Sequence, residues 1–302
     1  MRTRRNVFAT CLAAAFAVSL HASPGFAQDK KVPVIATFSI LGDLVKNVGG
    51  DRIDVTTLVG PNGDAHVYEP APADAKKVAA AKVVFVNGLG FHGWMTRLVK
   101  ASGTKAASVT ASKGVKSRKM EEEGHGIVTD PHAWQSVANT KIYIANIRDG
   151  LITADPAGKA TYESNAGAYL AKLDALETEV KAVIGRIPKD HRRIITSHDA
   201  FGYFGAAYGI EFIAPEGVST EAAASAKDVA KIISQIKKQK IPAVFMENIT
   251  DPRMMEQIAK ESGAKIGGSL FSDALSDEKG PAATYLDMMR NNIRQLSTAL
   301  VS

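Results

Sequence analysis

Three histidines stand where an imidazole could bind a ligand. His66 lies in NGDAHVYEP, which follows a β-branched run and a Pro-Asn-Gly turn. His132 lies in TDPHAW ahead of a helix-like segment, and His198 ends the strand-like run RIITSH. Ligands of open α/β sheets bind beyond the carboxyl ends of strands, so we expect these three imidazoles to share one site.

The other histidines fit a structural role or an exposed position better. His92 lies in the apolar turn GLGFHGWM, and His191 lies among charges in KDHRR. His125 lies in the acidic, glycine-flanked segment MEEEGHGIVTD, which we expect to be a solvated, mobile loop. These three are therefore not expected to be metal ligands.

The first 27 residues predict a cleavable secretory signal. They contain three arginines, an apolar run of about 14 residues that is too short to span a bilayer, and small residues that end at Ala27. The only cysteine, Cys11, lies inside this segment and upstream of any cleavage point, which argues against a lipid anchor. The mature chain, from about Gln28, is therefore expected in the periplasm with no disulfide and no thiolate ligand.

The charge balance excludes a strongly basic protein. The sequence has 37 Lys and Arg against 31 Asp and Glu. Removing Arg2, Arg4 and Arg5 with the signal leaves 34 against 31, a net charge of about +3. The short basic run at 237–240 reads as the solvated end of a helix, so no nucleic-acid partner is expected.

The positions of these histidines depend on an alternation of strands and helices along the chain, the βαβ pattern. Strand-like runs such as KVPVIATFS, DRIDVTTLV and KVVFVNG alternate with amphipathic segments, and a second such region begins near His191. Between them, residues 155–188 predict one long helix with Asp155 as its N-cap and Pro156 at its first position. We therefore expect two α/β lobes with mostly parallel sheets, divided as signal 1–27, N-terminal lobe 28–154, backbone helix 155–188 and C-terminal lobe 189–302.

The motifs GDAHVYEP, TDPHAWQS, TSHDAFGYFGAAYGIE, IPAVFMENITDP and GGSLFSDALS, in this order around the long helix, resemble the metal-binding solute-binding proteins of zinc and manganese ABC transporters. The resemblance covers essentially the whole mature chain. It implies a metal cleft between two lobes with His66, His132, His198 and Asp273 as ligands. It also implies a membrane permease with a cytoplasmic ATPase as partner, and we expect a monomer.

Three imidazoles and one carboxylate make a closed four-ligand set, which suits a carrier and leaves little room for a reactive water. The helical signature HExxH of zinc hydrolases is absent from the sequence, so the protein is not expected to be an enzyme. A nitrogen-rich set favours Zn²⁺ over Mn²⁺, with manganese as the alternative because the long histidine-rich loop of many zinc carriers is missing. Ordinary histidine pKa values near 6.5 predict metal release between about pH 7 and 5.

Four carboxylates are candidates to support the ligands through hydrogen bonds, namely Asp64, Asp130, Asp199 and Glu247, although helix or turn capping explains each of them equally well. Residues 217–226 depart from the Glu-Pro-Ser turn common in this family. We expect that departure to affect loop geometry more than metal binding.

Two other functions stay open, a periplasmic metallochaperone without a transporter and an adhesin-like surface binder.

Overall fold

The computed structural model describes residues 31–301, apart from residue 92 and residues 123–125. The expected signal at 1–27, together with His92 and His125, lies outside the described residues. Within the described part of the chain, every helix is too short or too polar to cross a membrane.

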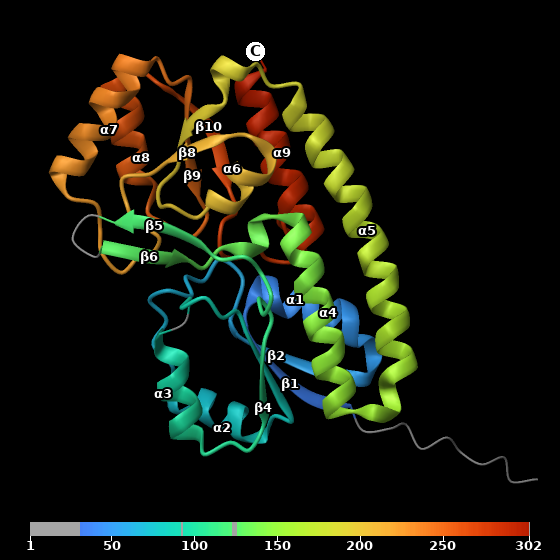
Figure 1. Ribbon diagram of the computed structural model, residues 1–302. Helices are drawn as coiled ribbons and strands as arrows, with labels where there is room; N and C mark the ends of the chain where they lie inside the picture. The colour runs from blue at the N-terminus through green and yellow to red at the C-terminus, as the bar shows by residue number, and fades with distance from the viewer. Residues whose placement is uncertain (1–30, 92, 123–125, 302) are drawn as a thin grey trace, which may run out of the picture. The chain divides into compact units, whose positions relative to one another are not determined.

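The first half of the described chain builds a parallel four-stranded sheet in the order β2-β1-β3-β4. The two central strands, β1 and β3, are largely buried, and helices connect successive strands (Figure 1). The elements are β1 (Val32–Phe38), α1 (Ser39–Gly49), β2 (Ile53–Val59), α2 (Pro72–Ala80), β3 (Val83–Val86), α3 (Gly93–Ser102) and β4 (Ala107–Thr110). Strand β4 has no counterpart among the runs read as strands from the sequence.

The second half builds another parallel four-stranded sheet, in the order β10-β9-β7-β8. Its elements are β7 (Arg193–Ile195), α6 (Gly202–Tyr208), β8 (Glu211–Ile213), α7 (Ala226–Gln239), β9 (Ala243–Glu247), α8 (Pro252–Ser262), β10 (Lys265–Leu270) and α9 (Tyr285–Leu300). Two parallel sheets with helical connections confirm the predicted α/β fold class of two lobes.

An antiparallel hairpin occupies the segment that the sequence reading treated as a mobile loop, and that reading is wrong for the described residues. Strand β5 (Arg118–Glu122) pairs with β6 (Gly126–Asp130) from Arg118–Asp130 to Glu122–Gly126. The segment lacks an apolar alternation, so its strand character comes from pairing between the two strands rather than from local pattern.

The long helix is present, although its start differs from the prediction. Helix α4 (Val137–Ala154) is followed by a short 3₁₀ turn, Pro156–Gly158, and then by α5 (Lys159–Gly185). Asp155 and Pro156 occupy the N-cap and first position of this 3₁₀ turn, as predicted, but the Asp155 side chain makes no capping bond. Its Oδ2 instead accepts hydrogen bonds from Arg52 Nη2 at 2.9 Å and from the Tyr162 hydroxyl at 2.7 Å. The lobe boundaries at 154/155 and 188/189 remain a prediction.

The 27 residues of α5 form a rod of about 40 Å. Figure 1 shows α5 running beside α4 and on towards α9, and α5 contacts α1, α4, α6 and α9. Its buried side chains repeat at steps of three and four, as the sequence predicts: Tyr162, Ala166, Tyr169, Leu173, Leu176, Val180 and Ile184. They belong to one continuous buried cluster that also holds side chains from both sheets, such as Val34 and Phe245.

Leu176→Ala is expected to lower the free energy of unfolding by about 2–5 kcal/mol, because the substitution leaves a cavity where α5 packs into this cluster. Lys172→Ala, on the exposed face of the same helix, is the matched control and should change stability by less than about 0.5 kcal/mol. Urea denaturation of both variants measures the difference. Equal stabilities would mean that α5 does not hold the core together.

Candidate metal centre

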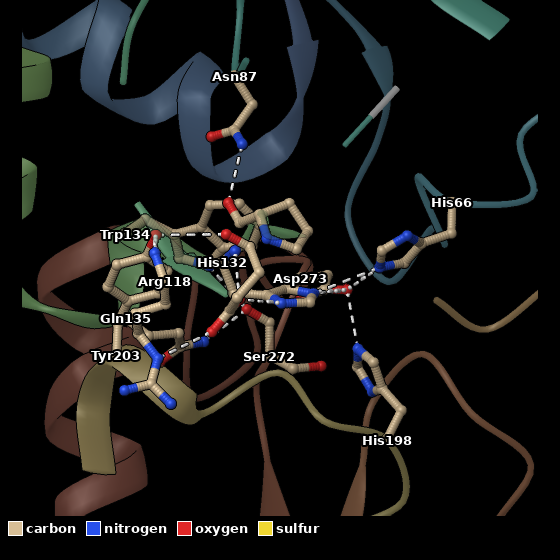
Figure 2. Close-up of polar contacts among 12 residues, drawn as sticks. His66, Asn87, Arg118, His132, Trp134, Gln135, His198, Tyr203, Ser272 and Asp273 are labelled. Atoms are coloured by element: carbon tan, nitrogen blue, oxygen red, sulfur yellow. Dashed lines mark hydrogen bonds and ion pairs between the residues drawn. The ribbon is translucent and has the colours of Figure 1, made fainter. Parts of the chain in front are cut away.

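The structure brings His66, His132, His198 and Asp273 together, all buried. Figure 2 shows the imidazoles converging on the Asp273 carboxylate. Asp273 Oδ2 lies 3.0 Å from His66 Nε2, 3.2 Å from His198 Nε2 and 3.5 Å from His132 Nε2. The Nε2 atoms of His66 and His132 are 3.3 Å apart.

These separations fit a tetrahedral cation site. Metal–nitrogen bonds of about 2.0–2.1 Å in a tetrahedron place neighbouring donors about 3.3–3.4 Å apart, which is close to the observed distances. The second carboxylate oxygen, Asp273 Oδ1, is buried with no hydrogen-bond partner in the described structure. The donor set is therefore three imidazole nitrogens and one carboxylate at the spacing that a small divalent ion requires.

The fold delivers each donor from the end of a strand. His66 lies in the loop after β2, His198 follows β7, and Asp273 follows β10, all beyond the carboxyl ends of parallel strands. His132 comes two residues after the hairpin strand β6, immediately before the 3₁₀ turn Ala133–Gln135. Ligands from both halves of the chain thus meet where the strands of the two sheets end, as expected for open α/β sheets.

Two of the four candidate supporting carboxylates hold ligand imidazoles. Asp130 Oδ1 lies 2.9 Å from His132 Nδ1, and Glu247 Oε2 lies 2.7 Å from His198 Nδ1. A carboxylate at Nδ1 fixes the ring and its tautomer so that Nε2 faces the cation. Asp64 instead accepts the backbone N–H of His66 at 2.8 Å, and no described hydrogen bond joins Asp199 to a ligand ring.

The segments carrying His132 and Asp273 are tied together by contacts that the sequence reading missed. The Ser272 carbonyl accepts hydrogen bonds from the Trp134 indole N–H at 2.9 Å and from Gln135 Nε2 at 2.7 Å. The donors lie two and three residues after His132, and the acceptor directly precedes Asp273. The sequence places Trp134 next to His132 in TDPHAW, but nothing in it identifies Ser272 as the partner of the indole.

On the far side of Asp130 lies a partly exposed cation, also missed from the sequence. The Arg118 Nε lies 3.4 Å from Asp130 Oδ2, and its guanidinium lies 5.7 Å from the centre of the Tyr203 ring. Gly202 lies close beside them, since a Cβ there would fall 2.6 Å from Asp130 Oδ2. Figure 2 shows Arg118 and Tyr203 beside His132, on the opposite side from His66.

Aromatic rings border the ligands and limit contact with water. The Phe91 ring lies edge-on to His66 with centroids 4.7 Å apart, and Trp134 lies 5.3 Å from His132. His66 is the most exposed of the four ligands at 7%, whereas the other three have no exposed surface. The site is therefore a buried polar cluster with little access to solvent.

Burial and the neighbouring carboxylates act in opposite directions on the pKa values of the clustered histidines. Burial lowers the pKa of His132, but the charge of Asp273 and the hydrogen bond to Asp130 outweigh it and raise this pKa to about 9. Burial also opposes the proton on His198, yet the charges of Glu247 and Asp273 hold its pKa well above the usual value. At His66 burial prevails and lowers the pKa.

The carboxylate shows the complementary shift. Burial raises the pKa of Asp273, but the facing charges of His132 and His198 keep it well below its usual value. In the protein alone at neutral pH, His132 and His198 therefore carry protons, His66 is neutral and Asp273 is ionised. A bound divalent cation takes the place of those two imidazole protons.

Comparison with known proteins places the chain in one family. Residues 34–299 match the family model of the zinc-uptake complex component A, periplasmic. The chain is 35% identical over 260 residues to the manganese-binding lipoprotein MntA of Halalkalibacterium halodurans, covering 86% of this chain and 85% of that one. It is 34% identical over 265 residues to the iron-binding protein YfeA of Yersinia pestis, covering 87% and 85%.

A solved structure shows the same architecture. The periplasmic zinc-binding protein TroA of Treponema pallidum superposes with a TM-score of 0.85 at 29% identity, covering 90% of this chain and 100% of that one. The family resemblance, the α/β fold and the expectation of a transport protein rather than an enzyme are thereby confirmed. The chain belongs to the periplasmic zinc-uptake component A family, the metal-binding solute-binding proteins of ABC transporters.

Proposed function

We propose that this protein binds one divalent transition-metal ion, with zinc as the preferred cargo, through His66, His132, His198 and Asp273. The observation that carries the proposal is the buried set of three Nε2 atoms and one carboxylate oxygen, all within 4.8 Å of one another and with four of the pairs 3.0–3.5 Å apart. Four protein donors close the coordination sphere, so the site suits capture and release of the ion rather than hydrolysis.

The preference for zinc rests on donor chemistry. Imidazole suits zinc, whereas manganese is favoured by carboxylate ligands, of which the cluster has one. Zn²⁺ also lies above Mn²⁺ in the general order of affinity of a given site for divalent first-row metals. Manganese is the second candidate, because similar chains are named for manganese and for iron as well as for zinc.

We further propose that the mature protein acts in the periplasm as a monomer without a lipid anchor. There it would hand the ion to a membrane permease driven by a cytoplasmic ATPase. Family membership supports the transporter partner, and the apolar segment ending at Ala27 supports secretion. A metallochaperone or an adhesin-like binder would use the same cluster without a permease.

The metal is tested by competition at neutral pH with equal, buffered free concentrations of zinc and manganese. We expect one zinc ion per chain after desalting, measured by elemental analysis, because the nitrogen-rich site binds zinc more tightly. Each metal offered alone is the control for loading. Manganese retained from the mixture would contradict the zinc assignment and leave the second candidate.

The ligand set is tested by His132→Ala, which removes one of the three nitrogen donors. The dissociation constant for zinc should rise at least about tenfold, equivalent to about 1.4 kcal/mol. The matched control is His191→Ala, because this ring bonds the Leu300 carbonyl at 2.8 Å, away from the cluster. Calorimetric titration of both variants gives the comparison, and equal affinities would remove His132 from the ligand set.

Proton release on binding follows from the shifted pKa values. Because His132 and His198 hold protons at pH 7 and must lose them to bind the ion, zinc binding should release about two protons. Apparent affinity should therefore fall on acidification and keep rising above pH 7 towards the His132 pKa of about 9. Calorimetry in buffers of different ionisation enthalpy counts the protons; fewer than one at pH 7 would show both rings to be neutral beforehand.

A further inference from the structure

The turn that carries His66 is bonded to segments from the second half of the chain. The backbone N–H of Asn62 donates to the Leu275 carbonyl at 2.9 Å, two residues after the ligand Asp273. Asp64 makes two contacts: Oδ1 accepts the His66 backbone N–H at 2.8 Å, and Oδ2 accepts the Thr220 hydroxyl at 2.5 Å. One carboxylate therefore joins the His66 backbone to a residue 156 positions away.

The Thr220 segment is in turn attached to the residues around His198. The Glu216 N–H donates to the Ser197 carbonyl at 3.3 Å, and the Asp199 N–H donates to the Gly217 carbonyl at 3.0 Å. The 217–226 segment, whose departure from the family turn we expected to affect loop geometry more than metal binding, thus contacts the backbone next to His198. A polar chain runs from His66 through Asp64 and Thr220 to the backbone on either side of His198.

His66 depends on this connection more than the other imidazoles depend on their loops. Asp130 and Glu247 hold the Nδ1 atoms of His132 and His198, whereas among the described residues no carboxylate contacts the Nδ1 of His66. His66 is also the ligand with exposed surface. Its position is fixed mainly by its turn, which Asp64 holds together with the Trp94 indole N–H, a donor to the Ala65 carbonyl at 2.8 Å.

We propose that the hydrogen bond between Thr220 and Asp64 is a latch that sets how long the bound ion stays in the site. This inference rests on the proposed metal-binding function. Thr220 is a positioning residue: it does not touch the ion, and acts through Asp64 on the placement of His66. The latch joins the Thr220 segment to the His66 turn only while that turn holds His66 at the cluster. Breaking the latch therefore speeds the departure of the ion and leaves its arrival unchanged.

The test measures zinc release from the loaded full chain after mixing with an excess of a chromogenic chelator, under conditions where dissociation limits the signal. Thr220→Val removes the hydroxyl and keeps the side-chain shape, so release should become roughly 3- to 10-fold faster, as expected for one lost hydrogen bond. The association rate constant should stay within roughly twofold of the original protein. Thr220→Ser retains a hydroxyl and should restore slow release.

Ser219→Ala is the matched control within the same segment. It removes the acceptor of the Glu221 N–H, a bond of 3.2 Å that does not reach the His66 turn, and should leave release unchanged. Equal release from Thr220→Val and the original protein would overturn the latch. The same follows if Ser219→Ala accelerates release as much, or if Thr220→Ser fails to restore it, since loop integrity would then be the cause.

The stoichiometry of the original protein separates this proposal from the proposed function. One zinc ion per chain with unchanged release in Thr220→Val defeats the latch and leaves the metal site standing. Failure of the original protein to hold zinc or manganese defeats both. Slower association in Thr220→Val would show damage to the capture step and would also count against a latch.

Discussion

A carboxylate and three imidazoles share one buried volume, and the rest of the structure depends on balancing their charges. Asp273 is fully buried, and an unpaired charge in such a position is penalised by several kcal/mol. In the protein alone, protons on His132 and His198 supply the opposing charge. A divalent ion supplies it instead when bound, so the same cluster is electrostatically satisfied in two ways. Exchange of protons for a cation is thus built into the composition of the site.

Two of the three imidazoles are each oriented by one carboxylate, whereas His66 relies on its turn and on the contacts of that turn. Glu247 Oε1 accepts the backbone N–H groups of Ser197 and His198, at 2.8 and 2.9 Å, while its other oxygen faces the ring. Asp130 likewise accepts both the backbone N–H and the ring of His132. Each of these imidazoles shares one carboxylate with its own backbone, which fixes Nε2 towards the cation. His66 has only the backbone half of this arrangement.

The sequence predicted the parts of the structure that local patterns determine. The β-branched runs became strands, the steps of three and four along α5 became its buried face, and the strand-end positions of His66 and His198 brought those rings together. The ligand role of Asp273 came from family resemblance, because a single carboxylate after the strand-like run AKIGGSLF does not by itself indicate a metal ligand. The β5–β6 hairpin lacks an apolar alternation, and the contact of Trp134 with Ser272 joins segments 138 residues apart, so local patterns in the sequence reveal neither of them.

The energetic cost of different motions decides which of them can exchange the ion. One buried cluster runs through both sheets and α5, and separating it would expose apolar surface at about 25 cal/mol for each Å². Even 200 Å² of such exposure costs on the order of 5 kcal/mol. Unseating the His66 turn breaks a few hydrogen bonds, each contributing about 0.5–1.5 kcal/mol net. His66 is also the least buried of the four ligands and has a lowered pKa, so local movement of this turn is a less costly route for the ion than wide separation of the lobes.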